Sequence, residues 1–374
     1  MTGAVKPAPG VHPARAPRSV LFLVPIGPYG PSGVLRALDY VPLLEADGIS
    51  TTVVSYDSPT IHRLRHLETG WSRWIPGKFF GLLNRLHRAW ALRTVLRRAA
   101  SHDVVFIQWV HPPAAWTREL ASRNPRIVFD LDDPVFLRDP EAAEALARTA
   151  RVVSAGSRFN LEWAQKQTDR AVYLHTQVPV HLFPQTSAPS GPWVEIAWVG
   201  SPSTMPYLEL LREPLAQVAQ RFPGRIRWTV VGTREASHEI PALFPGMEIR
   251  VIPWVGAQEL RDLLRTFHIG VTPLKEGIWE QGKSPGKTLQ YMAAGLPSIS
   301  SPVGEYVHVL KHGEEGFYAS TSQEWVEHLS RLVEDEELRT RMGRAARRRV
   351  EAEYSTEVCY ARLRSEVLGG AMRE

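Results

Sequence analysis

The amino-acid sequence predicts an α/β fold made of two doubly wound domains. Three observations support this prediction. The chain has 374 residues, of which 44% are hydrophobic, which is long for one core and sufficient for two. Short apolar runs that end in glycine, proline or a polar residue alternate with stretches of helical spacing. A segment rich in proline and serine interrupts this alternation near the middle of the chain.

Five apolar runs in the first half are interpreted as buried parallel strands. They are "SVLFLVPIG" (19–27), "ISTTVVSY" (49–56), "DVVFIQWV" (103–110), "RIVFDLDD" (126–133) and "RVVSAGS" (151–157). Helix-compatible stretches such as "LRALDYVPLLEADG" separate them. We therefore expect a first domain over residues 18–175, preceded by a disordered tail over residues 1–17.

The second half repeats the pattern after the proline- and serine-rich segment. Residues 176–192 are predicted to form the linker, and residues 193–352 the second α/β domain. Its strand-like runs include "EIAWVG", "RIRWTVVG", "HIGVTPL" and "PSISSPVG". Residues 353–374 are predicted to form a C-terminal helix that could pack back on the first domain.

Composition excludes several classes of protein. The single cysteine, Cys359, excludes an intrachain disulfide framework and a cysteine-based zinc cluster. With a single cysteine, a reducing, cytoplasmic setting fits best, and no apolar run reaches the roughly 18 to 20 residues of a membrane span. The net charge of +5 comes from 44 basic and 39 acidic residues, which is a mixed surface that favours acidic ligands but does not indicate nucleic acid.

The stretch "KSPGKTLQYMAAGLP" (283–297) predicts a short helix with an anion site at its start. Ser284 is a good N-cap, Pro285 suits the first helical position, and Gly295 stops the helix. Lys283 and Lys287 place two cations at the positive end of the helix dipole, which costs about 0.3 to 1 kcal/mol each unless an anion binds there. A phosphate on the free N–H groups fits this pattern, and two solvated lysines are the alternative.

The same stretch carries a resemblance to a known family. Residues "GKSPGKTLQYMAAGLPSISSPVGEYVHVLKHGEEGFYAS" and "LVEDEELRTRMGRAARRRVEAEYS" resemble the C-terminal nucleotide-sugar domain of the retaining glycosyltransferases of family 4. "GPYGPSGVLRALDYVPLLEADGIS" and "RIVFDLDDPVF" look like N-terminal segments of one subgroup. The resemblance implies the GT-B architecture, in which two Rossmann-like domains face each other across a cleft.

The resemblance also implies a donor site. Lys287 would contact the diphosphate of a nucleoside-diphosphate sugar, backbone N–H groups near Gly286 and Thr288 would complete the cradle, and Lys283 is a second candidate. This donor is a substrate, and neither a cofactor nor a metal is implied. The segment "VIPWVGAQEL" would lie beside the base, with Trp254 stacking and Val255 reading its edge. Gly304 and Glu305 would form a further phosphate-side loop, and a core tryptophan is the plain alternative for Trp254.

Two departures from the family pattern affect this assignment. The family commonly carries two glutamates separated by seven residues, and this chain has Gly282 and Gln290 at those places. Gln290 could still bind a ribose hydroxyl, and the sugar-side role would pass to Glu280, Glu276 or a backbone amide. The basic residues that the family places after the first strand of this domain are replaced by "WVGSPSTMPYL". There Gly200, Ser201, Ser203 and Thr204 could bind phosphate through N–H and hydroxyl groups.

Three polar groups follow strands of the first domain. Asp132 and Asp133 of "DLDD" are expected to bind sugar or acceptor, and structural capping is an alternative. Asp130 and Asp132 could instead hold Mg²⁺ or Mn²⁺, as in the unrelated GT-A transferases. His111 follows a strand end and is a cleft-facing candidate for catalysis beside Lys287 and Asp132, although a lone histidine is often a satisfied polar group.

The segment "GKFFGLLNRLHRAWALRTVLRRAA" (77–100) has six Lys or Arg residues and no acid. This pattern is typical of an interfacial helix that contacts a membrane, and a core helix with a basic face is the alternative. We therefore predict a metal-independent retaining transferase that moves sugar from a UDP- or GDP-sugar to a hydroxyl on a small-molecule, glycan or lipid-linked acceptor. A catalytically silent GT-B subunit or regulator and a metal-dependent GT-A-like transferase are the alternatives.

Overall fold

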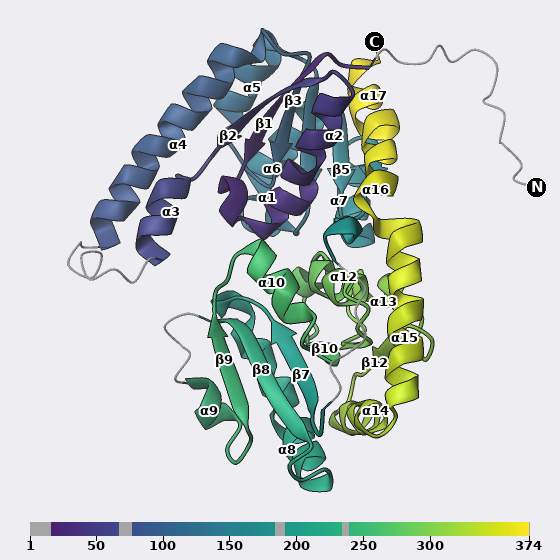
Figure 1. Ribbon diagram of the computed structural model, residues 1–374. Coiled ribbons are helices and arrows are strands. Elements are labelled where there is room, and N and C mark those ends of the chain that lie inside the picture. The colour runs from purple at the N-terminus through teal and green to yellow at the C-terminus, as the bar shows by residue number, and fades with distance from the viewer. Residues whose placement is uncertain (1–15, 67–76, 184–190, 234–238, 374) are drawn as a thin grey trace, which may run out of the picture.

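The computed structural model describes residues 16–66, 77–183, 191–233 and 239–373. In these ranges the chain forms two sheets of six parallel strands, each flanked by helices, stacked one above the other in Figure 1. The prediction of two Rossmann-like domains is thereby confirmed. Most of the predicted disordered tail, residues 1–15, lies outside the described residues.

The first sheet has the strand order β2-β1-β3-β4-β5-β6. Its strands are β1 (Ser19–Val24), β2 (Ser50–Ser55), β3 (Val104–Gln108), β4 (Ile127–Leu131), β5 (Val152–Ala155) and β6 (Ala171–Tyr173). The helices between them are α1 (Pro31–Arg36), α2 (Val41–Ala46), α3 (Pro59–His66), α4 (Gly77–Ala99), α5 (Ala114–Arg123), α6 (Pro140–Thr149) and α7 (Arg158–Gln167). The strands β1, β3, β4 and β5 are almost entirely buried, as their continuous apolar runs predict.

The second sheet has the strand order β12-β11-β10-β7-β8-β9. Its strands are β7 (Val194–Val199), β8 (Ile226–Thr233), β9 (Ile249–Pro253), β10 (Ile269–Thr272), β11 (Ser298–Ser300) and β12 (Gly316–Tyr318). The accompanying helices are α8 (Arg212–Arg221), α9 (Glu239–Leu243), α10 (Ala257–Leu264), α11 (Ile278–Gln281), α12 (Gly286–Ala293), α13 (Tyr306–Val309), α14 (Ser322–Glu334) and α15 (Glu336–Arg349).

The C-terminal segment returns to the first sheet. It consists of α16 (Thr356–Arg362), a π-helical stretch Leu363–Leu368 and α17 (Gly369–Met372), shown in yellow beside the upper domain of Figure 1. Cys359, Leu363 and Val367 belong to the same buried cluster as Val20 and Phe22 of β1. This segment therefore contributes to the core of the first domain.

The described part of the linker is packed against this returning chain. Val178 pairs with Ser355 in an isolated parallel bridge, and the Gln177 side chain accepts a hydrogen bond from Thr356. Gln177 Nε2 also donates to Asp39 Oδ2 at 2.9 Å. Residues 184–190 of the predicted linker lie outside the described residues. No helix in the described ranges is long and apolar enough to cross a membrane.

Candidate active site

A cavity of about 530 Å³ lies between the two domains. The first domain contributes the loop after β1, including Pro28 and Tyr29, and the linker contributes Val178 to the lining. The second domain contributes the ends of β7 and β8, the segment after β9 with part of α10, and Lys287 and Gln290 of α12. Since all the strands are parallel, the cavity lies at the carboxyl ends of the strands, where doubly wound domains bind ligands.

The structure brings five of the predicted donor-site residues to this cavity. They are Gly200, Trp254, Val255, Lys287 and Gln290, and Gly286 precedes Lys287 in the first turn of α12. Trp254 is exposed on one face, and its ring centroid lies 6.4 Å from that of Tyr29 in the other domain. The base-stacking role predicted for Trp254 is therefore sterically open.

The start of α12 differs in detail from the prediction. Pro285, not Ser284, occupies the N-cap position, and no side chain caps the helix. The Ser284 hydroxyl lies 2.7 Å from Thr176 Oγ1 of the linker instead, so a contact between domains replaces the local cap. The first N–H groups of α12 consequently lack a side-chain acceptor, which leaves them available to an anion. Gly295, with φ of +75°, follows the helix as predicted.

Lys287 lies in an environment that disfavours its charge. Its Nζ donates to Thr204 Oγ1 at 3.0 Å and lies 4.9 Å from the centroid of the Trp198 ring. Burial, with a further contribution from Lys283, lowers the pKa of Lys287 to about 7, and Asp133 opposes this shift. Neither lysine is among the ion pairs of the described residues, so a bound anion would supply the missing countercharge.

The residues predicted after β7 form a polar turn next to Lys287. Ser201 N donates to Thr204 Oγ1 at 3.1 Å, and the Ser201 and Ser203 hydroxyls lie 2.9 Å apart. Gly200 is required by its surroundings, because a Cβ there would lie 2.0 Å from the Trp198 ring. Thr288 is fully buried, and its hydroxyl contacts those of Thr272 and Ser300, so only its backbone N–H could contribute to a phosphate cradle.

Asp132 and Asp133 face the start of α12 from the other domain. Asp132 Oδ1 accepts from Thr176 Oγ1 at 3.1 Å, which connects it to Ser284. Asp133 accepts a hydrogen bond from the Ser284 N–H, and burial together with the Asp132 charge raises its pKa, with Lys283 opposing. The structure therefore brings Asp132, Asp133 and Lys283 together where the two domains meet, although none of them is among the residues that line the cavity.

Asp130 is not available as a metal ligand. It is fully buried and forms two hydrogen bonds with Arg36, one of them from Nε to Oδ2 at 3.0 Å. Ser154 Oγ donates to its other oxygen at 2.6 Å. The metal site suggested for Asp130 and Asp132 is therefore wrong, because one of its two carboxylates is held by a buried arginine. Within the described ranges, no group of three or more His, Cys, Asp or Glu side chains could hold a metal ion.

Glu305 has a different role from the one predicted. Its buried carboxylate accepts hydrogen bonds from the Arg158 N–H at 2.7 Å and the Tyr173 hydroxyl at 2.5 Å, and it pairs with the Arg158 guanidinium. Arg158 and Tyr173 belong to the first domain, so Glu305 connects the domains rather than facing a phosphate. Gly304, with φ of +55°, packs against α11, where a Cβ would lie 2.3 Å from the Gln281 carbonyl oxygen.

Gly282 stands where the family carries its first glutamate, and residues of the first domain leave no space for a side chain there. Asn160 Nδ2 donates to the Gly282 carbonyl at 3.0 Å, and a Cβ on Gly282 would lie 2.6 Å from Asn160 Oδ1 and 2.7 Å from Pro134. Among the substitutes considered, Glu280 is buried and accepts a hydrogen bond from the Tyr207 hydroxyl, whereas Glu276 is exposed. Glu280 is thus held by its own domain.

His111 follows β3 in the first domain, and it is not among the residues that line the cavity. Burial lowers its pKa to about 4, so the imidazole is neutral at pH 7. Its ring packs edge-on against Phe129, and Nε2 has no partner among the described residues. A neutral imidazole with one unpartnered buried nitrogen can exchange a hydrogen bond with a ligand hydroxyl.

A match to a known family covers the second domain. Residues 194–335 match the family model described as glycosyl transferases group 1. This domain is a group 1 glycosyltransferase domain. The match includes Gly200, Trp254, Lys287 and Gly304, and it ends at the start of α15. No curated protein sequence matches the chain.

Solved structures share the fold over nearly the whole chain. HepE of Anabaena, in complex with UDP and glucose, has a TM-score of 0.65 at 15% identity, covering 92% of this chain and 98% of that one. Sucrose-phosphate synthase of Thermosynechococcus elongatus has a TM-score of 0.67 at 12% identity, covering 92% and 97%. The lipopolysaccharide outer core galactosyltransferase WaaB has a TM-score of 0.63 at 14% identity, covering 93% and 99%. The whole chain therefore has the GT-B fold that the resemblance implies.

Sequence reasoning missed a cluster that joins the glycosyltransferase domain to the first domain. The Arg138 guanidinium lies over the Trp279 ring of α11 at 4.2 Å and 5.7 Å from the Trp109 ring. Trp109 has φ of 60°, and its indole nitrogen is buried without a partner among the described residues. The strained backbone of Trp109 at the end of a strand marks this cluster in the structure. The sequence carries no signal of that strain.

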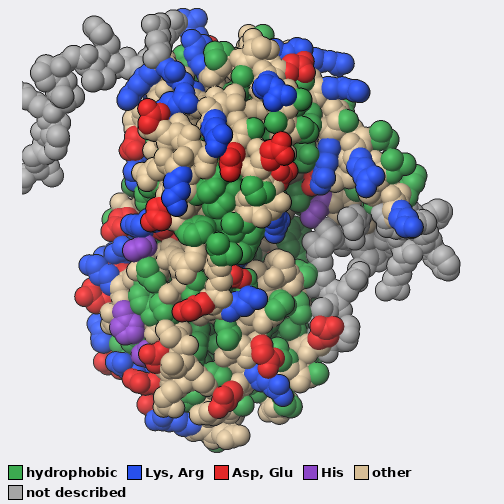
Figure 2. Space-filling model, turned by 180° about the vertical axis from the view of Figure 1, so that it is seen from behind, with side chains coloured by type: hydrophobic (Ala, Val, Ile, Leu, Met, Phe, Trp, Pro, Cys, Tyr) green, Lys and Arg blue, Asp and Glu red, His purple; other side chains and the backbone are tan. Residues whose placement is uncertain are grey.

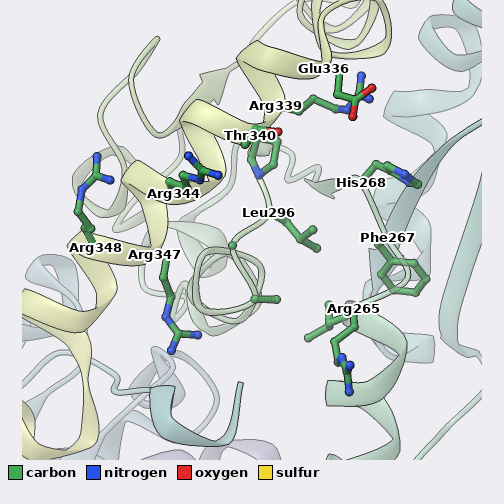
Figure 3. Close-up of a pocket in the computed structure, with 14 residues that line it drawn as sticks. Arg265, Phe267, His268, Leu296, Glu336, Arg339, Thr340, Arg344, Arg347 and Arg348 are labelled. Atoms are coloured by element: carbon green, nitrogen blue, oxygen red, sulfur yellow. The ribbon is translucent and has the colours of Figure 1, made fainter. Parts of the chain in front are cut away.

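A second cavity, of about 490 Å³, lies in the glycosyltransferase domain at residues 294–297, which follow α12, and is also lined by residues of α15. Five arginines line it: Arg265, Arg339, Arg344, Arg347 and Arg348. In Figure 3 the guanidinium groups of Arg265, Arg347 and Arg348 lie apart and do not converge on one point. Arg339 and Arg347 instead donate to backbone carbonyls, including Leu332 at 2.6 Å and Phe183 at 2.6 Å. This basic cavity therefore does not compete with the cleft as the donor site.

Proposed function

We propose that this protein transfers a sugar from a nucleoside-diphosphate donor, a UDP- or GDP-sugar, to a hydroxyl acceptor, with retention of configuration and without a metal. One observation carries the proposal. Lys287, partly desolvated beside the uncapped start of α12, lines a cavity between two domains and lacks a carboxylate partner in the described ranges. HepE was solved with UDP-glucose, which supports a uracil nucleotide as the first donor to test.

In this proposal the donor diphosphate lies on the first turn of α12. The N–H groups of Gly286, Lys287 and Thr288 lie at the positive end of the helix dipole. As the bond between the anomeric carbon and the diphosphate breaks, negative charge builds on the leaving oxygen. The Lys287 ammonium, already positioned by Thr204, stabilises that charge more than it stabilises the intact donor.

The first domain holds the acceptor in this proposal. The acceptor hydroxyl attacks the anomeric carbon of the donor sugar on the same face from which the diphosphate leaves. The departing phosphate oxygen takes the proton of that hydroxyl. Asp132, Asp133 and the neutral His111 would orient sugar and acceptor hydroxyls by hydrogen bonding. The protein then contributes position and charge rather than a covalent nucleophile.

A specific observation favours a second candidate, a catalytically silent GT-B subunit. Gly282 supplies no carboxylate, and Asn160 and Pro134 fill the space that one would need. A silent subunit could still bind the nucleotide through Lys287. Donor turnover, not nucleotide binding, is therefore the measurement that separates the two candidates.

Release of UDP or GDP from a panel of nucleotide sugars tests the proposal. The purified protein is expected to release nucleoside diphosphate from one donor, and to do so faster with added acceptor. The rate should be unchanged in EDTA, because Lys287 and α12 supply the positive charge. Nucleotide binding without turnover of any donor would favour the silent subunit, and activity abolished by EDTA would contradict metal independence.

A further inference from the structure

Helix α4 is apolar on two opposite faces. One face packs into the core of the first domain through Phe80, Ala91, Val95, Leu96 and Ala99. The other face carries four large apolar side chains in water: Phe79 is 49% exposed, Leu82 53%, Leu86 61% and Trp90 54%. The spacings of three, four and four residues align these side chains along one side of the helix. We call these four residues the α4 stripe.

Exposed basic residues flank the α4 stripe. They are Lys78, Arg85, Arg93 and Arg97, and the helix contains no Asp or Glu. None of these four residues is among the ion pairs of the described part of the chain, whereas Arg88 on the flank pairs with Asp57. Figure 2 shows the green and blue side chains of this region side by side on the upper right, where α4 projects from the first domain.

The helix is held so that the α4 stripe cannot turn inward. Asn84 Nδ2 donates to Asp57 Oδ1 at 2.8 Å, and its oxygen accepts from the Ser58 N–H at 3.0 Å. His87 Nε2 lies 3.0 Å from the Ser55 carbonyl oxygen. The exposure of four large apolar side chains is therefore a fixed feature of the surface, and a contiguous patch of this kind marks an interaction site.

We propose that the α4 stripe docks the protein on an anionic lipid surface. An α-helix with an apolar stripe and a basic rim lies in the plane of the membrane, with its apolar side chains among the acyl chains and its cations at the lipid phosphates. A second copy of this chain is a poorer occupant, because two such surfaces would bring arginines against arginines. A free soluble anion would not require four apolar side chains.

The position of α4 relates this surface to the cleft. A crossover helix runs antiparallel to the strands it connects, so the first half of α4, with Phe79, Leu82 and Leu86, lies at the edge of the sheet that faces the cleft. A docked protein would therefore present the acceptor side of its cleft to the lipid headgroups. The docking inference does not depend on the transferase activity, and its test has a separate readout.

Flotation with vesicles tests the inference. The wild-type protein is expected to float with vesicles containing 30% phosphatidylglycerol, and much less with pure phosphatidylcholine. The triple variant Leu82→Ser, Leu86→Ser, Trp90→Ser should bind at least tenfold more weakly. The double variant Arg85→Gln, Arg93→Gln should lose about fivefold per charge, since a basic residue near an anionic surface contributes about 1 kcal/mol.

A matched control keeps the result specific. The variant Arg344→Gln, Arg348→Gln removes the same charge from exposed positions on α15 and should bind vesicles as the wild type does. The circular dichroism spectrum and the thermal midpoint of each variant verify that it is folded. The inference is overturned if the wild-type protein does not float with anionic vesicles, or if the triple variant binds them as strongly as the wild type does. It is also overturned if the wild type sediments as a dimer that the triple variant dissociates, because the α4 stripe is then a protein interface.

Discussion

Lys287 shows how one residue connects local sequence to ligand binding. Its pKa of about 7 means that about half of the lysine is uncharged in the free protein at pH 7. A bound diphosphate favours the ammonium form and raises this pKa. Binding therefore takes up a proton, and the affinity for UDP should fall as the pH rises from 7 to 9, above the range where phosphate itself titrates.

Calorimetric titration of UDP in buffers of different ionisation enthalpy measures this proton uptake. We expect a fraction of a proton taken up at pH 7 and close to one at pH 8.5. The variant Lys287→Met should bind UDP more weakly and without buffer dependence. A wild-type binding enthalpy that is the same in every buffer at pH 8 would show that Lys287 does not titrate with the ligand.

Residues whose partners are local were predicted better than those with distant partners. The cationic start of α12 follows from residues 283–297 alone, because the dipole argument needs only the helix and its lysines. Glu305 was misjudged, since its partners Arg158 and Tyr173 lie 147 and 132 residues away in the chain. Asp130 was likewise misjudged because Arg36 lies 94 residues away. No local pattern reports such pairs.

At the scale of elements, two glycines on helices predict opposite effects of the same substitution. Gly343 of α15 packs directly on the turn after α12, where a Cβ would lie 1.9 Å from the Gly295 carbonyl oxygen. Gly343→Ala should destabilise the protein by about 1 to 3 kcal/mol, because α15 must move away. Gly81→Ala on α4 meets no atom within 4 Å and should stabilise the protein by about 0.5 to 1 kcal/mol. Denaturant unfolding measures both, and a Gly343→Ala variant as stable as the wild type would contradict the packing.

The strands and α4 were predictable as elements because buried parallel strands are short continuous apolar runs, and because the aromatic, leucine and arginine residues of α4 follow helical spacing. The cap of α12 was not, because the Ser284 hydroxyl that suits a cap is used by Thr176 of the linker. The sequence left open whether α4 is an interfacial helix or a core helix with a basic face, since periodicity alone does not tell which apolar side chains are buried.

At the scale of the molecule, several contacts hold the domains together on one side of the cleft. Glu305 binds Arg158 and Tyr173, and Arg138 lies over Trp279. Replacing Glu305 by Gln keeps the shape but removes the charge, and it should lower the thermal midpoint by about 2 to 6 °C. Glu314→Gln, which affects only an exposed pair with Lys311, is the control and should change little. Equal midpoints for the two variants would show that the contacts of Glu305 with Arg158 and Tyr173 do not stabilise the protein.

The two-domain architecture followed from the alternation of strands and helices on either side of one proline-rich segment. The sequence also suggested that the C-terminal helix returns to the first domain, and the cluster of Cys359 and Leu363 with β1 shows that it does. The closure of the cleft by Asn160 against Gly282 could not be predicted, because it depends on how two separately folded domains meet.

The central claim is that the cleft holds a nucleoside diphosphate on the start of α12. A crystal structure of the protein with UDP tests it most directly. We predict diphosphate oxygens within hydrogen-bonding distance of Lys287 Nζ and of the first N–H groups of α12, with the base beside Trp254. A diphosphate that binds elsewhere, for example among the arginines of α15, and makes no contact with Lys287 would contradict the account.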